Sequence, residues 1–397
     1  MSDRFVLHHG DCLDVLKTME DNSVDSIVTD PPYGLSFMGK KWDYDVPSED
    51  IWRECLRVLK PGGYLLSFAG TRTQHRMAVR IEDAGFEIRD MIAWVYGSGF
   101  PKSHSVGKNI EKINVGGIKN LKQISTKKGI KVETGTSGFS YSKEYVAGKS
   151  MGGSQISGDI PVYEINNEWG GWGTALKPAL EPITVARKPL SEKTVAENVI
   201  KHGTGGINID GCRVPTEIGD EVCNHGRKPT VNGYDPRMSG HQEYGQTSGQ
   251  EIGRFPANLI HDGSEEVLKI FPNCIGGSAA RFFYCAKSSK TDRGDGNNHP
   301  TVKPCDLMRY LCKLVTPPNG TVLDPFNGSG STGKACMYEG FNYIGIERDQ
   351  DYIDISTKRI GFALNDAGEG EKKRAKKVVL TEPPKPIGFK SKPIKSA

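Results

Sequence analysis

A short apolar segment, VDSIVTD at 24–30, ends in an aspartate followed by two prolines and a tyrosine, Asp30-Pro31-Pro32-Tyr33. A carboxylate at this position can accept hydrogens from an exocyclic amine of a nucleobase, and it can stabilise the positive charge that grows on nitrogen during alkylation. The carbonyl of Pro31 offers a second acceptor, and the two prolines fix the loop so that the acceptors need little reorganisation. Tyr33 can stack on an extruded base, where its ring face suits a growing cation. A plain proline turn after a strand is the competing interpretation.

A second candidate loop lies far along the chain, where the segment TVLDPF at 321–326 runs into a glycine-rich stretch. Gly328, Gly330 and Gly333 fit the pattern G-x-G-x-x-G, and Glu347 follows Gly328 by 19 residues at the end of the next apolar segment. Such glycines allow a backbone to approach a nucleoside cofactor closely, and an acid at this distance can bind ribose hydroxyls. A tight strand-to-helix turn without a ligand is the alternative.

Three ligand classes compete for this glycine loop. NAD fits the glycine pattern. A phosphate-binding loop is compatible with Gly328 to Lys334, but Ala335 stands where a Ser or Thr would bind magnesium. S-adenosylmethionine carries no phosphate, and an acid such as Asp324 at the strand end can meet its cationic amino-acid end. The flanking acid therefore favours S-adenosylmethionine.

Both loops are predicted to follow strands of one parallel sheet. Strand patterns at 5–10, 24–30, 64–70 and 86–94 alternate with helical patterns at 12–19, 48–60 and 73–84. The alternation returns with strands at 281–287, 321–326 and 342–347 and helices at 303–315, 331–339 and 349–360. This rhythm indicates an α/β fold built from both ends of the chain, with helices on the faces of the sheet. Ligands bind at the carboxyl edge of such sheets.

The rhythm fails between about residues 97 and 281, where Gly, Ser, Asn and Lys are frequent and no helical period is visible. A segment of this length without regular structure indicates a separate module or a set of binding loops. Lys102 and Lys108 stand near its start and can contact DNA phosphates.

The loop at 34–46, directly after the aspartate-proline motif, carries two lysines and apolar side chains. Lys40, Lys41 and Trp42 lie within it, and we expect this loop to close over a target base or a duplex. An ordinary surface loop with Trp42 packed on the domain is the alternative.

Composition limits the class of protein. The chain has 397 residues, and no apolar run approaches the roughly 20 residues of a membrane span. The start MSDRFVLHHGD shows no signal-peptide pattern, so we expect a cytoplasmic protein. None of the nine cysteines forms a Cys-x-x-Cys pair, which disfavours a metal site. Residues 365–397 hold nine Lys or Arg and four Asp or Glu, and from 361 we predict a basic disordered tail.

The motifs and their order resemble a known family. The sequence DPPYG followed much later by DPFNGSGSTG is similar to the DNA amino-methyltransferases, and the order of catalytic motif, recognition region and cofactor motif is that of their β group. HPTVKPCDLM at 299–308 and GDCLDVL at 10–16 resemble the family's additional cofactor-pocket segment and its start. Segments such as WGGWGTALKPALEPITVARKPL resemble phage and prophage members. The resemblance implies a Rossmann-like methyltransferase fold with a circularly permuted motif order and a large inserted target recognition region.

The resemblance also implies roles for single residues. The catalytic loop comprises Asp30, Pro31, Pro32 and Tyr33. Asp349 is expected near the cofactor, although it fits equally well as the N-cap of the last helix. The full set expected around S-adenosylmethionine is Asp11, Thr301, Lys303, Asp324, Phe326, Gly328, Ser329, Gly330, Ser331, Glu347 and Asp349.

The implied domains are a catalytic half at 1–100, a target recognition insertion at 101–280, a cofactor-binding half at 281–360 and the tail at 361–397. The expected partner is double-stranded DNA, with no membrane. A homodimer and a cognate restriction enzyme stay open.

The family transfers a methyl group directly to an exocyclic amine, without a covalent enzyme intermediate. Asp before Pro-Pro-Tyr usually accompanies adenine N6 in this family and Ser accompanies cytosine N4, so we expect site-specific methylation of a flipped adenine. Cytosine N4 stays open as the alternative. The remaining alternatives are a catalytically silent DNA-binding protein of the same fold, a nucleotide-dependent enzyme, and a methyltransferase acting on RNA or protein.

Overall fold

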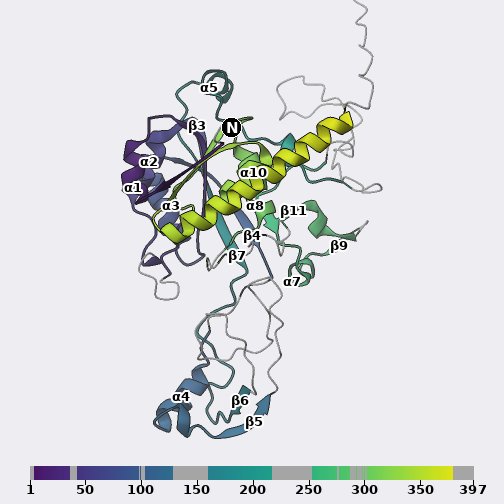
Figure 1. Cartoon of the computed structure of the whole chain (residues 1–397). Helices are drawn as coiled ribbons and strands as arrows, with labels where there is room; N and C mark the ends of the chain where they lie inside the picture. The colour runs from purple at the N-terminus through teal and green to yellow at the C-terminus, as the bar shows by residue number, and fades with distance from the viewer. Residues whose placement is uncertain are drawn as a thin grey trace, which may run out of the picture.

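A nine-stranded sheet forms the centre of the protein (Figure 1). The computed structural model describes residues 4–35, 43–97, 99, 103–127, 160–216, 253–274, 277–286, 292, 297, 299 and 302–378. In spatial order the strands are β1 (Phe5–His9), β13 (Asn342–Glu347), β12 (Thr321–Asp324), β2 (Val24–Thr29), β3 (Leu59–Phe68), β7 (Leu180–Arg187), β4 (Glu87–Val95), β8 (Leu259–His261) and β11 (Tyr284–Cys285).

The first five strands in this order are parallel to one another, and they come from both ends of the chain. β1 pairs with β13, β13 with β12, and β12 with β2, where Ile27 lies opposite Leu323. β3 then continues the parallel run beside β2. All six residues of β2 are buried, as expected for the central strand of a sheet covered on both faces. The single α/β sheet predicted from the two ends of the sequence is confirmed, with a Rossmann-like arrangement of strands and helices.

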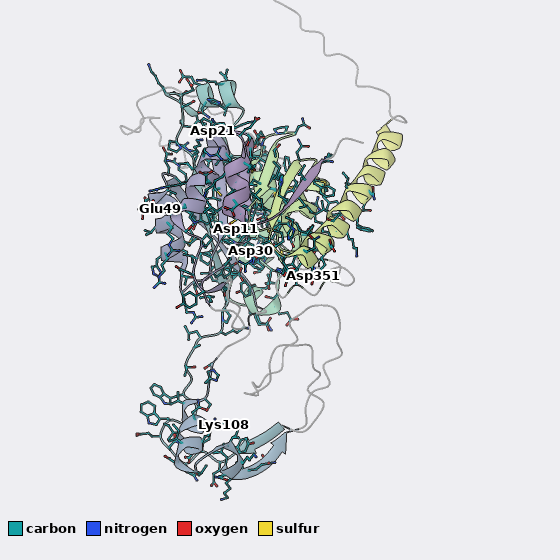
Figure 2. The ribbon with its side chains drawn as sticks, turned by 60° about the vertical axis from the view of Figure 1, so that its left-hand side comes forward. Asp11, Asp21, Asp30, Glu49, Lys108 and Asp351 are labelled. Carbon is teal, nitrogen blue, oxygen red and sulfur yellow. The ribbon has the colours of Figure 1, made fainter. Side chains whose placement is uncertain are left out.

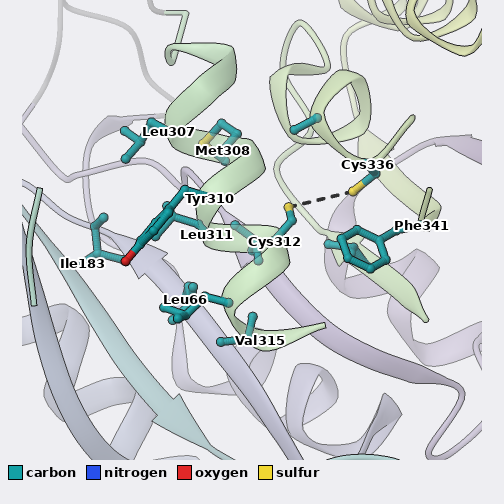
Figure 3. Packing of buried hydrophobic residues seen from close by; sticks show 14 of the residues in the cluster. Leu66, Ile183, Leu307, Met308, Tyr310, Leu311, Cys312, Val315, Cys336 and Phe341 are labelled. Carbon is teal, nitrogen blue, oxygen red and sulfur yellow. Dashed lines mark hydrogen bonds between the residues drawn. The ribbon is translucent and has the colours of Figure 1, made fainter. Parts of the chain in front are cut away.

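Helices cover both faces of this sheet. One face is covered by α1 (Cys12–Thr18), α2 (Glu49–Val58) and α3 (Gln74–Asp83), whose Leu16, Trp52 and Met77 are fully buried. The other face is covered by α8 (Cys305–Val315), α9 (Ser331–Glu339) and α10 (Gln350–Val378). α8 packs Leu307 and Leu311 into this core, and the Cys312 thiol lies 3.9 Å from that of Cys336 on α9 (Figure 3).

Most elements agree with the sequence patterns, and two differ. The strand predicted at 281–287 is only Tyr284–Cys285, because a 3-10 turn, η5 (Ala279–Phe282), occupies the preceding residues and Ser278 caps it. The last helix continues to Val378, so the part of the predicted disordered tail between 361 and 378 is helical. Its Ala, Glu and Lys residues favour a helix. The rest of the tail lies outside the described residues.

The predicted insertion at 101–280 also needs correction, because part of it belongs to the central sheet. β7 lies between β3 and β4 and is antiparallel to both, with Val185 opposite Leu66. β8 extends the sheet beside β4, and α5 (Val195–His202) packs near β3. A late strand that enters the sheet antiparallel does not continue a β-α-β rhythm, which is why the sequence pattern missed it.

A small unit projects from the sheet beyond the ends of β4 and β7 (Figure 1). It contains α4 (Val106–Asn114), η3 (Ile118–Asn120) and the antiparallel pair β5 (Gln123–Lys127) and β6 (Ile160–Tyr163). The remaining elements are η4 (Asp210–Cys212), α7 (Glu265–Leu268), β9 (Asn273–Cys274) and β10 (Gly277–Ser278). In the part of the chain that the structure describes, no helix combines the length and apolarity needed to cross a membrane.

Candidate active site

Four acidic residues stand at the carboxyl ends of four neighbouring parallel strands. Asp11 follows β1, Glu347 ends β13, Asp324 ends β12 and Asp30 follows β2. Because these strands are adjacent and parallel, their carboxyl ends share one edge of the sheet. The fold thus brings the two predicted loops, which are distant in sequence, to one place. Figure 2 shows Asp11 and Asp30 in the body of the protein and Lys108 in the projecting unit.

The Asp30 carboxylate has a partner at each oxygen. The Tyr33 hydroxyl donates to Oδ1 at 2.7 Å, and the Lys303 ammonium donates to Oδ2 at 2.7 Å. Lys303 also lies 3.1 Å from the Tyr33 hydroxyl and 4.8 Å from the centre of the Phe68 ring. The sequence placed Lys303 near the cofactor, whereas its ammonium contacts residues of the catalytic loop.

The backbone of the catalytic loop is held by side chains outside it. The Asp43 carboxylate accepts the amide hydrogens of Tyr33 at 2.8 Å and Gly34 at 2.9 Å. The Thr73 hydroxyl donates to the Tyr33 carbonyl at 2.6 Å. Gly34 has φ +65, and a Cβ there would lie 2.9 Å from the Val46 nitrogen, so glycine is required. These contacts fix Tyr33 and its ring relative to Asp30.

Glu181 is a member of this cluster that the sequence did not reveal. It lies near the start of β7, opposite Trp94 of β4. Its Oε2 accepts the Tyr33 hydroxyl at 3.0 Å and lies 3.2 Å from the Lys303 ammonium. A single glutamate in an apolar strand carries no motif, so only the pairing of β7 with β3 and β4 brings it here.

Burial and the neighbouring charges shift the pKa values of Tyr33 and Lys303. Burial, Asp30 and Glu181 raise the pKa of the Tyr33 hydroxyl well above its usual value. Burial alone would lower the pKa of Lys303, but Asp30 and Glu181 outweigh it and raise that pKa. At neutral pH the cluster therefore holds a neutral tyrosine, an ammonium and two carboxyl groups.

The Asp324 carboxylate is buried, and three hydrogen bonds from the protein satisfy it. Its Oδ1 accepts the Thr29 hydroxyl at 2.6 Å and its Oδ2 accepts the Thr332 hydroxyl at 2.7 Å. The Phe326 amide also donates to Oδ1, and the residue is 2% exposed. Burial raises the pKa of Asp324 to about 6, against the lowering effect of these hydrogen bonds. Asp324 thus ties the ends of β2 and β12 to the start of α9.

The glycine loop adopts conformations that suit glycine and packs closely on its surroundings. Gly328 has φ +50 and Gly330 has φ +79. A Cβ on Gly330 would lie 2.8 Å from the Ser356 Cβ of α10, and one on Gly333 would lie 2.6 Å from the Tyr343 ring. Two of the three glycines therefore permit close packing of the loop and α9 against α10 and β13.

Other residues expected around the cofactor lie in the glycine loop or close to it in the sequence, and Asp11 lies after β1. The Ser329 hydroxyl accepts from the Arg359 guanidinium at 2.8 Å. Ser331 is the first residue of α9, and the Phe326 ring meets Trp52 edge-on at 6.3 Å between centroids. Asp11 caps α1 by accepting the Leu13 amide at 2.9 Å.

Comparison with known proteins decides the family. The family model described as DNA methylase (N6_N4_Mtase) matches residues 24–358, which is most of the chain. The chain belongs to the N6/N4 DNA methylase family. The predicted DNA amino-methyltransferase family is therefore confirmed.

The chain is also similar to the following relatives and solved structures. The chain is 22% identical over 411 residues to the type II methyltransferase M.HindIII of Haemophilus influenzae, covering 93% of this chain and 99% of that protein. It is 48% identical to M.HinfI of Haemophilus influenzae over 62 residues, which are 16% of this chain and 17% of that one. The M1.HpyAVI–SAM complex aligns with a TM-score of 0.40 and 17% identity, over 90% of this chain and 98% of that chain. The cytosine-N4-specific PvuII DNA methyltransferase aligns with a TM-score of 0.41 and 15% identity, over 91% and 92% of the two chains.

The cofactor of this DNA methylase is S-adenosylmethionine, as predicted. The Glu347 carboxylate joins the glycine loop to the start of α10. Oε2 accepts the Gly328 amide at 2.8 Å and Oε1 accepts the Asp349 amide at 2.9 Å. Asp349 itself accepts the Asp351 amide at 3.0 Å, as an N-cap of α10 does.

Several predicted contact residues of this DNA methylase lie outside the described residues. They are Lys40, Lys41, Trp42, Lys102 and Thr301. Lys108 is described, and its ammonium stands over the Tyr163 ring at 4.3 Å from the centroid. Burial lowers the pKa of Lys108. Its contacts thus join α4 to β6 within the projecting unit.

Proposed function

We propose that this DNA methylase transfers the methyl group of S-adenosylmethionine to the N6 amine of an adenine that is flipped out of a specific DNA site. The arrangement of Asp30 and Tyr33 at the carboxyl end of β2, beside the glycine loop after β12, supports this reaction. The choice of adenine rests on the aspartate before Pro31-Pro32-Tyr33, which in this family usually accompanies adenine rather than cytosine.

Each part of the loop has a task in this reaction. S-adenosylmethionine, when bound, supplies the electrophilic methyl group. The Asp30 carboxylate and the Pro31 carbonyl accept the two hydrogens of the target amine, which localises the lone pair on nitrogen. Asp30 also stabilises the positive charge that nitrogen gains as the methyl arrives. The half-buried Tyr33 ring, held by Asp43 and Thr73, provides a stacking surface for the flipped base.

We assign DNA recognition to the projecting unit. Its described parts, 103–127 and 160–177, hold six lysines and three glutamates, which favours contact with phosphates. Trp169 and Trp172 lie there edge to face at 5.1 Å between ring centroids, and they are 40% and 60% exposed. Exposed aromatic rings beside basic residues can stack on nucleic-acid bases.

Analysis of labelled nucleosides tests the proposal. The protein is incubated with mixed-sequence duplex DNA and S-adenosylmethionine that carries an isotopically labelled methyl group, and the digested DNA is examined by mass spectrometry. Label on N6-methyl-2′-deoxyadenosine is the expected result. Label on N4-methyl-2′-deoxycytidine would show that the target base is cytosine, and the mechanism would stay the same. Absence of label from DNA, in protein that binds the cofactor, would refute the proposal in favour of an RNA or protein substrate or a silent binding protein.

A further inference from the structure

Two carboxylates share one ammonium and one hydroxyl in the catalytic cluster. Lys303 lies 2.7 Å from an oxygen of Asp30 and 3.2 Å from an oxygen of Glu181. The Tyr33 hydroxyl lies 2.7 Å from Asp30 and 3.0 Å from the same Glu181 oxygen. The Lys303 side chain is 9% exposed, so water screens these interactions weakly.

These contacts conflict with the task proposed for Asp30. An acceptor for the target amine needs free lone pairs and a net negative charge. In the structure the Tyr33 hydroxyl takes one lone pair of Oδ1 and the Lys303 ammonium takes one of Oδ2, so fewer lone pairs remain for the amine. An ammonium held at this distance offsets much of the charge that would stabilise the methylated nitrogen.

Glu181 offers both donors a second acceptor. A hydroxyl has a single hydrogen, so Tyr33 donates to either Asp30 or Glu181 at one time. The ammonium has three hydrogens, and a small rotation brings it from Asp30 toward Glu181. Both donors can therefore leave Asp30 without losing a partner, which avoids the large cost of an unpaired buried charge.

The position of Glu181 is well fixed. The residue lies in β7 between two paired strands, opposite Trp94. Tyr96 lies beside the same side chain, whose charge adds to burial in raising the pKa of the Tyr96 hydroxyl, and the Tyr96 ring packs on Trp94 at 4.9 Å between centroids. A carboxylate held in this way can receive donors without moving itself.

We infer that Glu181 is a positioning residue for methyl transfer, which takes over the Tyr33 hydroxyl and the Lys303 ammonium when the target amine engages Asp30. This inference rests on the proposed function. Its rival is a purely structural role, in which Glu181 only balances the buried charge of Lys303.

Kinetics of Glu181→Gln and Glu181→Asp separate the two roles. Glutamine keeps the size but holds the ammonium weakly, so kcat is expected to fall on the order of 10- to 100-fold, with unchanged KM for DNA and unchanged Kd for S-adenosylmethionine. Aspartate keeps the charge and is expected to restore part of kcat. Glu87→Gln is the matched control, because Glu87 pairs with Arg187 across the same two strands, away from the cluster. It is expected to lower stability and leave kcat unchanged.

The Tyr33→Phe background supplies a second readout. Phenylalanine removes one of the two donors that Glu181 is inferred to receive. Glu181→Gln is then expected to lower kcat by a smaller factor than it does in the wild-type protein. An equal factor in both backgrounds, or wild-type kcat per folded molecule in Glu181→Gln, would overturn the inference.

Methyl transfer by the wild-type protein distinguishes failure of this inference from failure of the proposed function. Absence of methyl transfer to DNA by the wild-type protein would refute the proposed function itself. Transfer by the wild-type protein and equally by Glu181→Gln would refute only the role of Glu181.

Discussion

Asp30 and Asp324 end neighbouring parallel strands but have opposite surroundings. Asp30 is half-buried, and its partners are a tyrosine hydroxyl and an ammonium that have a second acceptor nearby. Asp324 is fully enclosed, and two threonine hydroxyls and one amide satisfy it. The first arrangement leaves a carboxylate that can exchange partners with a substrate. The second gives a carboxylate whose main effect is on the fold.

The pKa of Asp324 predicts a pH dependence of stability. Burial raises this pKa from 3.8 to about 6, so between these values the folded state binds more protons than the unfolded state. Stability therefore falls as pH rises through this window, by up to about 3 kcal/mol from this group. Asp324→Asn does not titrate and can keep hydrogen bonds to both threonines.

Urea unfolding of wild type and Asp324→Asn between pH 4.5 and about 7.5 measures this effect. The stability of the wild type relative to the variant is expected to decrease as pH rises, because only the wild type must bury a charge. If the free energies of unfolding of the two proteins changed with pH in parallel, burial of the Asp324 charge would carry no cost in stability.

Substitutions at Tyr33 separate its ring from its hydroxyl. Tyr33→Phe keeps the stacking surface and removes the hydroxyl that is inferred to move from Asp30 to Glu181, so kcat is expected to stay within about threefold of the wild-type value. Tyr33→Ala also loses the surface for the base, so kcat/KM for DNA is expected to fall about tenfold or more beyond that. Steady-state kinetics on a duplex substrate measures both. Equal losses in the two variants would contradict a stacking role for the ring.

The elements that the sequence predicts well are those with a strong local signal. The bounds of α9 and β13 agree with the patterns at 331–339 and 342–347, because apolar periodicity and flanking glycines define them locally. β7 was missed, since Pro182 argues against a central strand and antiparallel pairing breaks the rhythm. Asp30 is predicted because the contiguous motif Asp30-Pro31-Pro32-Tyr33 follows a strand, whereas the place of Glu181 in the cluster depends on the pairing of β7.

Gly333 of α9 packs closely against Tyr343 of β13, so a larger residue at this position is expected to lower stability. A Cβ on Gly333 would lie 2.6 Å from the ring of Tyr343, which is buried and hydrogen-bonded to Asn327 at 2.8 Å. Gly333→Ala is therefore expected to destabilise the protein by about 1–3 kcal/mol, since the ring cannot move aside freely.

Gly361→Ala in α10 is the matched control. No atom lies within 4 Å of a Cβ placed there, and alanine favours a helix by up to about 1 kcal/mol over glycine. Urea unfolding of both variants measures the contrast. Equal stability of the Gly333 variant and the wild type would mean that α9 does not need close packing against β13.

The whole molecule combines a sheet that carries the reaction with a unit that projects away from it (Figure 2). Strands from both ends of the chain bring Asp30 and the glycine loop together. β4 leads into the segment that forms the projecting unit, and β7 follows it. We propose that a duplex contacts the unit while a flipped base reaches the edge of the sheet.

The exposed pair Trp169 and Trp172 is expected to contribute to duplex binding. Replacing Trp169 and Trp172 by alanine is expected to weaken duplex binding at least about tenfold, because each stacked base is worth roughly 1–3 kcal/mol. The Kd for S-adenosylmethionine is expected to stay the same. Fluorescence anisotropy at fixed salt measures duplex binding, with Phe362→Ala as control, since Phe362 is an exposed aromatic residue on α10. Unchanged duplex affinity in the double variant would place recognition elsewhere.

The most direct test of the account compares methyl transfer and cofactor binding in Asp30→Ala. Asp30 is proposed to stabilise charge on the target amine and follows β2, whereas the glycine loop follows β12. Transfer of labelled methyl groups to duplex DNA is expected to fall by about 100-fold or more, while calorimetry is expected to give an unchanged Kd for S-adenosylmethionine. Transfer at a rate near that of the wild type would contradict the central claim that this carboxylate performs the reaction.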